Sequence, residues 1–470
     1  MMNYKSCLWV GVLAAATAVS GSMGCSQKSQ KSEQVSSDNW TNLFDGKTLD
    51  GWKRVAGEAP YEVKDGAIVG TTIANTPNTF LVTEKEYGDF VLELDAMVES
   101  NGSNSGIQTR SHFDPEANNG KGRVYGRQVE FDPSERAWTG GIYDEARRGW
   151  LYPLSLNPEA RQAFKMGEYN KIKIECIGNE TKTWINDVPV AYVVDTLDPS
   201  GFIGLQVHSI NNEEQAGKKV FFKNIRIKTT DLTPTPFPAG VYVVNNQPNA
   251  LTAYEQEHGW KLLFDGKTTE GWVGAYKSSF PEKGWKVENG ALTVLPSDGG
   301  ESQNGGDIVT SAKYRAFDLS FDFKLTPGAN SGVKYFVTLS ENNSGSAIGL
   351  EYQILDDEKH PDAKMGRNGN RTLASLYDLI TAEKQSRFLR PIGEWNKGRV
   401  VVHPNNKVEH FLNGIKVLEY ERGSAAFREL VANSKYKDWE NFGEATEGHI
   451  LLQDHGDQVS FRSIKIKELK

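Results

Sequence analysis

Hydrophobic and polar residues alternate along several short runs of the chain. Between residues 90 and 98, and again between 317 and 325, every second position is apolar. Side chains two apart share a face of a strand, so this pattern predicts β-strands with one face on a core. The segments 171–176 and 181–185 flank a Gly-Asn turn and predict a hairpin that buries Cys176. Helical periodicity is weak and confined to residues 424–433.

The chain contains one unit twice. Leu43–Trp52 reads LFDGKTLDGW, and the same pattern returns at Leu263–Trp272 as LFDGKTTEGW. Three prolines between residues 229 and 238 mark a connection without periodicity. Short strands separated by turns favour two packed antiparallel sheets in each unit, an all-β jelly-roll sandwich. We therefore predict one sandwich over residues 39–230, a linker over 231–255 and a second sandwich over 256–470.

Composition supports this reading and narrows the partners. The chain has 470 residues, enough for two domains that each bury a core, and 46 glycines with 10% aromatic residues are typical of antiparallel β proteins. The net charge is −8, and lysines and arginines form no basic stripe, which argues against nucleic acid as a partner. Thr252–Glu255 has the capping-box form and predicts a short helix before the second unit.

The first 25 residues have the features of an export signal. Lys5 is followed by an apolar run from Cys7 to Val19 and by small residues that end in Gly24-Cys25. A cysteine after glycine resembles the bacterial lipobox, so we expect lipidation of Cys25, with residues 26–38 as a flexible tether. An ordinary signal peptide is the alternative. The expected location is the periplasm or outer membrane of a Gram-negative bacterium, anchored through lipid.

Four short motifs recur in the same order in both units. They are Asn-Ser-Gly, a Gly-led strand that carries acid and amide groups, Gly-Glu-Tyr/Trp-Asn, and Leu-Gln-x-His. Their positions are 104–106 and 330–332, 126–132 and 349–356, 167–170 and 393–396, and 205–208 and 452–455.

Polar side chains of the Gly-led strand share one face. Such a face either meets solvent or lines a groove, and its repetition beside a Gln-x-His strand favours a groove where carboxylate, amide and imidazole meet. In the first unit these side chains are Gln128, Glu130, Asp132 and His208, and in the second they are Glu351, Gln353 and His455.

Together these motifs resemble the 3-keto-disaccharide hydrolase domain family over residues 39–230 and 256–470. The resemblance implies a secreted protein with concanavalin-like jelly-roll domains. It also implies cleavage of small 3-keto-glycosides, after a sugar 3-oxidoreductase has oxidised carbon 3 to a ketone. The second unit follows the family pattern more closely, because the first exchanges the types of Gln128 and Glu130 and carries Lys223 in place of Arg462.

A ketone at carbon 3 acidifies the hydrogen on carbon 2, so a carboxylate or histidine can remove it as a general base. The anomeric oxygen then leaves, and water addition to the enone gives net hydrolysis. A cation such as Lys334 or Arg462, or a bound metal, would stabilise the enolate. Glu351 and His455 are the candidate base and acid, in either order. The full catalytic set is Glu351, His455, Gln353, Asp356, Glu130 and His208, and the substrate-binding set is Lys334, Arg462, Arg110, Gln128, Asp132 and Tyr143.

Two other functions remain open at this stage. Glu130-x-Asp-x-x-Glu135 resembles the catalytic strand of retaining β-glucanases, although Pro133 interrupts it. A lectin-like module without catalysis would use aromatic rings such as Trp138, Tyr143 and Trp150 as sugar platforms. The sequence shows no zinc-ligand pattern and requires no cofactor, and the acidic run 356–358 offers oxygen ligands of the kind that bind Ca²⁺.

The lipid anchor is directly testable. We expect Cys25→Ser to release the protein from the membrane fraction, because the thiol that carries the lipid is removed. Fractionation of cells that express each form, followed by immunoblotting, measures this. Retention of the variant in the membrane fraction would contradict the lipobox interpretation.

Overall fold

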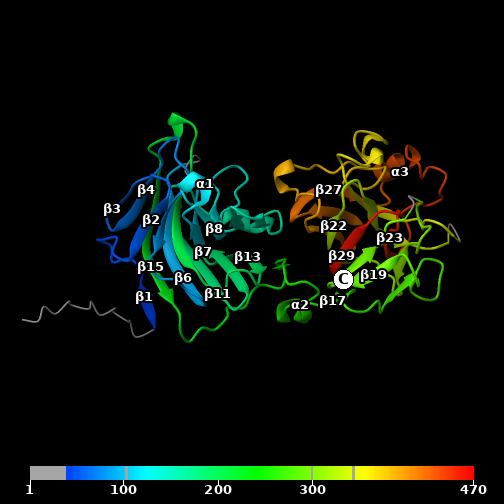
Figure 1. Cartoon of the computed structure of the whole chain (residues 1–470), viewed down its shortest axis with the longest axis horizontal. Coiled ribbons are helices and arrows are strands. Elements are labelled where there is room, and N and C mark those ends of the chain that lie inside the picture. The colour runs from blue at the N-terminus through cyan, green and yellow to red at the C-terminus, as the bar shows by residue number, and fades with distance from the viewer. Residues whose placement is uncertain (1–38, 101–103, 298–299, 341–343) are drawn as a thin grey trace, which may run out of the picture.

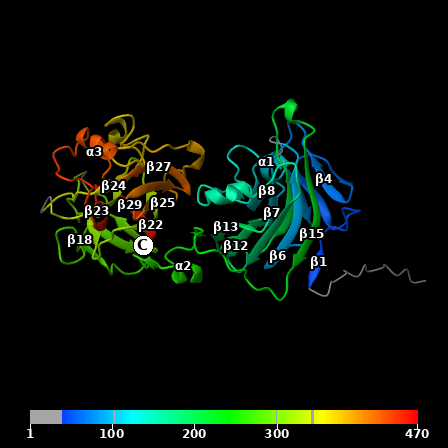
Figure 2. The same cartoon turned by 180° about the vertical axis from the view of Figure 1, so that it is seen from behind.

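The computed structural model of the chain describes residues 39–100, 104–297, 300–340 and 344–470 (Figure 1). The predicted lipidation site Cys25 and the tether lie outside these residues. Two β-rich domains lie side by side and are joined by one connecting segment (Figures 1 and 2). Within the described residues, none of the helices has the length and hydropathy needed to cross a membrane.

Two antiparallel sheets form the first domain. The first sheet has the order β16-β13-β12-β11-β6-β15-β4-β3, with β1 beside β15, and the second has the order β10-β9-β8-β7-β14-β5-β2. The strands of the first sheet are β1 (Trp40–Asn42), β3 (Tyr61–Lys64), β4 (Ala67–Thr71), β6 (Phe90–Val98), β11 (Asn170–Ile177), β12 (Glu180–Ile185), β13 (Val188–Val194), β15 (Lys219–Lys228) and β16 (Val244–Asn245). Those of the second are β2 (Trp52–Ala56), β5 (Thr79–Thr83), β7 (Ser105–Asp114), β8 (Arg123–Phe131), β9 (Ile142–Glu145), β10 (Gly149–Tyr152) and β14 (Phe202–Val207).

The second domain repeats this plan. Its sheets have the orders β19-β20-β29-β22-β25-β26-β27, with β17 beside β29, and β18-β21-β28-β23-β24. The first of these contains β17 (Trp260–Leu262), β19 (Trp285–Glu288), β20 (Ala291–Val294), β22 (Phe317–Leu325), β25 (Asn396–Val402), β26 (Lys407–Leu412), β27 (Ile415–Glu421) and β29 (Val459–Glu468). The other contains β18 (Trp272–Gly274), β21 (Ile308–Thr310), β23 (Asn330–Val337), β24 (Leu350–Leu355) and β28 (His449–Leu452).

Helices are short and lie in the connections. They are α1 (Ala117–Gly120), α2 (Ala253–Glu257) and α3 (Ala425–Ala432), with 3-10 turns at Pro158–Gln162, Glu213–Gln215, Pro361–Lys364 and Ser386–Phe388. The predicted capping box is present at α2, where the Thr252 hydroxyl accepts the N–H of Glu255 and the Glu255 carboxylate accepts the N–H of Thr252. The weak helical pattern at 424–433 corresponds to α3.

The predicted all-β architecture of two tandem sandwiches is confirmed. The strands predicted at 90–98 and 317–325 are β6 and β22, and their apolar faces pack into one hydrophobic core in each domain. Cys176 is buried in the first core, as the hairpin pattern predicted. Alternation identified these strands because burial of one sheet face requires it.

The connecting segment packs against both domains. β16 pairs in parallel with β13 and so extends the first sheet, while Phe237 and Val243 pack with the side chains of Trp184 and Tyr192. The sequence predicted only a linker here, because proline-rich segments show no periodicity. The connecting segment is therefore held against the first domain by strand pairing and by apolar contacts.

Glu255 of α2 joins the segment to both domains. Its buried carboxylate accepts a hydrogen bond from Asn245 of β16 at 2.8 Å and forms an ion pair with the buried ammonium of Lys465 on β29. A buried charge without its partner is costly, because the protein interior does not solvate it as water does. The position of α2 therefore depends on this ion pair, which links it to β29 of the second domain.

Removal of one charge tests how much this ion pair contributes to stability. We expect Glu255→Gln to lower the free energy of unfolding by about 3–5 kcal/mol, because Lys465 then stays buried without its partner. Urea unfolding followed by circular dichroism measures the change. The double variant Glu255→Gln/Lys465→Met should recover most of the loss, and Glu257→Gln, on the exposed face of α2, is the control. A single variant as stable as the unchanged protein would contradict this assignment.

Candidate functional site

Equivalent strands place the recurring motifs together in each domain. β8 pairs with β7 so that Glu130 lies opposite Gly106, and β24 pairs with β23 so that Gln353 lies opposite Gly332. Because both glycines belong to the Asn-Ser-Gly motif, Gln353 is the structural counterpart of Glu130. It follows that Glu351 corresponds to Gln128, two residues earlier on each strand.

The glycine of the Asn-Ser-Gly motif makes room for a polar side chain. A Cβ added at Gly332 would lie 2.1 Å from Oε1 of Glu351, and a Cβ at Gly106 would lie 2.5 Å from Cδ of Gln128. Side chains of the neighbouring strand therefore lie flat across both glycines. This close approach is a physical reason for glycine at this point of each repeat.

The second domain holds a cavity of about 210 Å³ over β23 and β24. Glu351 has 4% of its surface exposed at the floor, and Lys334 and Gln353 lie beside it. Loops supply the remaining walls. The lining residues are Glu301, Asn330, Lys334, Ser346, Ala347, Ile348, Gly349, Glu351, Gln353, Tyr377, Lys435, Tyr436, Trp439, Gln453 and His455, and we call this cavity the second-domain groove.

Amide groups orient the acids of this groove. The Gln353 amide, with its nitrogen facing the carboxylate, donates to Glu351 Oε1 at 3.1 Å. Gln453 donates to Glu301 Oε1 at 2.9 Å, and its own Oε1 is buried without a hydrogen-bond partner among the described residues. A buried acceptor without a donor carries a desolvation cost that a bound ligand can relieve.

Burial and nearby cations tune the two carboxylates in opposite directions. Burial raises the pKa of Glu351, although Lys334 and Lys435 partly oppose this effect. Burial also works against the charge of Glu301, but Lys334 and a hydrogen bond from Ser346 outweigh it and lower the pKa. Burial lowers the pKa of Lys435. One acid is therefore held closer to neutrality than the other, an arrangement typical of acid–base sites.

Two sequence candidates of the second domain lie outside this groove. Asp356 accepts the backbone N–H groups of Gly328, Glu358 and Lys359, so it shapes the loop after β24. Arg462 lies on the other sheet, where it pairs with Asp322 at 3.3 Å and lies over the Trp395 ring. Sequence spacing did not show this, because Arg462 follows His455 closely in the chain yet belongs to a strand of the opposite sheet.

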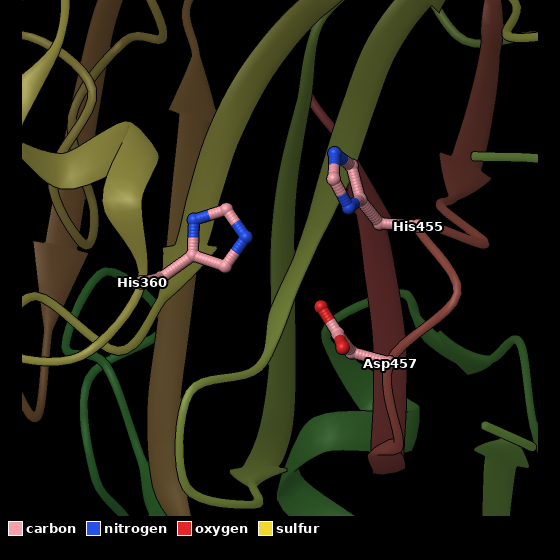
Figure 3. A group of neighbouring side chains, drawn as sticks. All are labelled: His360, His455 and Asp457. Carbon is pink, nitrogen blue, oxygen red and sulfur yellow. The ribbon is translucent and has the colours of Figure 1, made fainter. Parts of the chain in front are cut away.

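The acidic run after β24 is also used by the fold. Asp357 forms an ion pair with Lys384 at 2.6 Å and accepts the backbone N–H of Leu373. Asp356 and Asp357, which the sequence suggested as Ca²⁺ ligands, thus both make contacts that hold the loop after β24. A different group, His360, His455 and Asp457, has the donor types of a metal site, and Figure 3 shows it.

The first domain has an equivalent cavity of about 370 Å³, which we call the first-domain groove. Its lining includes two residues from the second domain, so the groove is completed only when the domains are together. The lining residues are Asn78, Asn104, Gln128, Glu130, Arg136, Tyr143, Glu145, Gly149, Trp150, His208, Arg387 and Phe388.

Glu130 is the buried acid of the first-domain groove. Burial raises its pKa to about 7, despite hydrogen bonds from Asn104 and Gln128. Burial also lowers the pKa of His208, whose Nδ1 contacts the backbone oxygen of Ser209 at 2.6 Å. The first-domain groove also differs from the second in one charged residue. Gln108 occupies the strand position that Lys334 has in the second domain.

Other first-domain candidates divide between groove and framework. Tyr143 lines the groove next to Trp150, with ring centroids 5.4 Å apart. Arg110 is buried elsewhere, where it pairs with Asp89 and donates to backbone oxygens. Asp132 pairs with Arg136 at 2.6 Å beyond the end of β8.

Several groove residues gave no signal in the sequence. Glu301, Tyr377, Lys435 and Trp439 come from loops far apart in the chain, outside the recurring motifs. Phe388 reaches the first-domain groove from the second domain and contacts Trp138, with ring centroids 5.9 Å apart. Loop residues of this kind are placed by tertiary packing rather than by a local period.

Known proteins resemble this chain over about half of its length. The chain is 38% identical over 232 residues to a 3-keto-disaccharide hydrolase of Bacteroides thetaiotaomicron. The matched region covers 45% of this chain and 79% of that protein. Two solved structures from Parabacteroides distasonis, each described as a "putative glycosyl hydrolase", are 31% and 27% identical and cover 48% and 45% of this chain. They cover 100% and 99% of their own chains, with TM-scores of 0.42 and 0.34.

A family model described as a 3-keto-alpha-glucoside-1,2-lyase-like domain matches residues 39–228 and 259–467. These two matches coincide with the two sandwiches. The chain therefore belongs to the 3-keto-α-glucoside-1,2-lyase-like domain family and carries one copy of the domain in each half.

Proposed function

We propose that the second-domain groove cleaves 3-keto-glycosides by elimination across carbons 1 and 2. Family membership and the similarity to a 3-keto-disaccharide hydrolase support a carbohydrate-active function. One structural observation carries the finer assignment. Glu351 is a buried carboxylate with a raised pKa, and Lys334 and Lys435 lie in the same groove. A base and cations are the two components that enolate formation requires.

The reaction divides into steps that these residues can perform. Glu351 takes the proton from carbon 2, which the adjacent ketone has made acidic, and the electron pair forms an enolate. Lys334 or Lys435 stabilises the negative charge on the ketone oxygen. The enolate then expels the anomeric oxygen, which takes a proton from His455, and the products are an enone and the free alcohol. Addition of water to the enone gives net hydrolysis.

The first-domain groove is better suited to binding than to this chemistry. It presents Tyr143 and Trp150, and aromatic rings of this kind stack on the apolar faces of sugars. It has Gln128 and Gln108 where the second domain has Glu351 and Lys334. We therefore assign carbohydrate binding to this groove, which keeps the lectin-like alternative for one half of the chain.

The glucanase alternative has less support. That mechanism needs two carboxylates about 5 Å apart, yet β8 ends at Phe131 and Glu135 is exposed beyond it. Glu135 is also absent from the lining of the first-domain groove. The proposal also includes export and lipid anchoring through Cys25. The protein would act after a sugar 3-oxidoreductase, since the substrate must carry its ketone before it reaches the groove.

A substrate pair tests the proposed chemistry. We expect the purified protein to cleave a 3-keto-disaccharide and to leave the unoxidised parent intact, because only the ketone acidifies the hydrogen on carbon 2. Glu351→Gln should lower kcat by about 10²–10⁴, the usual contribution of a general base. Product formation is followed by chromatography and by absorbance of the enone.

Glu130→Gln is the matched control in the other domain, and it should leave kcat within about twofold, because an acid that acts only in binding contributes none of the 10²–10⁴ of a general base. Loss of kcat in Glu130→Gln with full activity in Glu351→Gln would move catalysis to the first domain. Cleavage of the parent sugar would contradict elimination.

The pH profile tests the role of Glu351 as base. A base acts when deprotonated, so kcat/KM rises with pH through its pKa. Lys334 lowers the pKa of Glu351. We therefore expect Lys334→Met to move the acidic limb of the kcat/KM profile to higher pH, in addition to any loss of rate. Initial rates measured across pH give both limbs, and an acidic limb that does not move would exclude Glu351 as the titrating base.

A further inference from the structure

We propose that His360, His455 and Asp457 bind a divalent transition-metal ion at the edge of the second-domain groove. One ligand atom from each residue lies within 4.8 Å of the other two, and all three side chains are half-buried. Figure 3 shows the His360 and His455 rings and the Asp457 carboxylate turned toward one space. His455 also lines the groove, so this space adjoins the proposed site of catalysis.

Two loops bring the three residues together. His360 lies in the loop after β24 and begins the 3-10 turn Pro361–Lys364, where its Nδ1 accepts the N–H of Asp362 at 3.2 Å. His455 and Asp457 lie between β28 and β29, on either side of Gly456, which has a φ of 89°. Such a φ favours glycine, because a Cβ is strained in that region. The tight turn there lets two nearby side chains converge.

Backbone contacts hold the donors without using all of their capacity. Asp457 Oδ2 accepts the N–H of Asn330 at 3.0 Å, and a carboxylate has about four acceptor sites on its two oxygens. The two rings are nearly perpendicular, at 81° with centroids 5.8 Å apart, so they do not stack on each other. A ring nitrogen binds a metal in the plane of its ring, so two unstacked rings keep their edges available for ligation.

The donor types select the class of metal. Two imidazoles and one carboxylate suit Zn²⁺, Fe²⁺, Co²⁺ or Ni²⁺, whereas Ca²⁺ and Mg²⁺ prefer sites made of oxygen. Three protein ligands with room for a further one are typical of catalytic zinc sites. Ligand atoms around one zinc lie roughly 3.4 Å apart at bond lengths of 2.0–2.1 Å. The ligand atoms here lie within 4.8 Å of one another, so they need to approach by at most about 1.4 Å (4.8 − 3.4).

Binding has a definite consequence for the ring of His360. Its Nδ1 accepts a hydrogen bond, so the neutral ring carries its proton on Nε2. Ligation through Nε2 moves that proton to Nδ1 and breaks the bond to Asp362, which at 3.2 Å lies at the long end of normal geometry. The site therefore exchanges one weak backbone contact for a metal ligand.

The first domain provides an internal comparison. The motif Leu-Gln-x-His-x-x ends in Asp457 in the second domain and in Ile210 in the first. His208 therefore has no carboxylate two residues later, and it contacts the backbone of Ser209 instead. The same fold thus carries the donor set in one copy and lacks it in the other.

The role of the ion rests on the proposed function. A cation beside the groove would stabilise the enolate oxygen as a Lewis acid. In Figure 3 one ring nitrogen of His455 faces His360 and Asp457 while the other points away from them. Ligation through the first nitrogen leaves the proton on the second, so His455 can bind the metal and still donate a hydrogen bond to the leaving oxygen. In the metal-bound protein, the proton that Glu351 has taken from carbon 2 would then pass to that oxygen.

Metal binding is measured without substrate. Untagged protein is stripped with a chelator, equilibrated with Co²⁺ and freed of unbound ion by dialysis. We expect one bound Co²⁺ per chain by elemental analysis, with visible absorption of cobalt in a site of low coordination number. Asp457→Asn and His360→Ala should each weaken binding by at least about 10–100-fold, a loss that even outer partners of metal ligands cause. Asn at 457 keeps the acceptor for Asn330, so the loop should remain folded, and circular dichroism checks this.

Control variants separate this proposal from the catalytic one. His208→Ala should retain the full cobalt content, because it removes the equivalent histidine of the first domain. Glu351→Gln should also retain cobalt while it loses sugar cleavage. Absence of cobalt from the unchanged protein, or equal binding by Asp457→Asn, would overturn the metal site and leave the elimination proposal standing. Cobalt binding that depends on Asp457, in a protein that does not cleave 3-keto sugars, would support the metal site and reject the proposed function.

Discussion

The pairing register between β23 and β24 is the constraint on which the site depends. It sets Gly332 opposite Gln353 and lays the Glu351 side chain over the glycine, where any Cβ would collide with it. A shift of one residue would turn Glu351 toward the core, because strand side chains alternate between faces. Val333 of β23 and the core residues Tyr352 and Ile354 of β24 oppose such a slip, because they would lose their buried positions. Packing of apolar residues on one face thus holds the polar residues on the other.

Burial gives this polar face its chemical character. A carboxylate at the floor of the groove is separated from water, which raises its pKa, and lysines at the walls limit that rise. At Glu301, Lys334 and a hydrogen bond from Ser346 outweigh burial and lower the pKa. Neither effect requires an unusual residue. Both follow from charges placed in a cavity where solvent does not screen them fully.

Duplication supplied two frames that have diverged at a few positions. Glu130 and Gln353 occupy one equivalent position, and Gln128 and Glu351 occupy the other. The acid has therefore moved by two residues along the strand, which keeps it on the same face. Because Phe388 and Arg387 of the second domain line the first-domain groove, the second half of the chain completes a surface of the first half. The ion pair between Glu255 and Lys465 helps to keep that arrangement in place.

The sequence by itself determined the duplication, the all-β class, the alternating core strands and the capping box at Thr252, because each is a periodic or local pattern. It also determined which polar side chains share a strand face, such as Glu351 and Gln353. Tertiary structure decided which loops close over that face. It brought Lys435 and Glu301 into the groove and placed His360 beside Asp457, and it directed Arg110 and Arg462 into ion pairs elsewhere. These positions depend on the return path of segments distant in the chain, and no local spacing encodes that path.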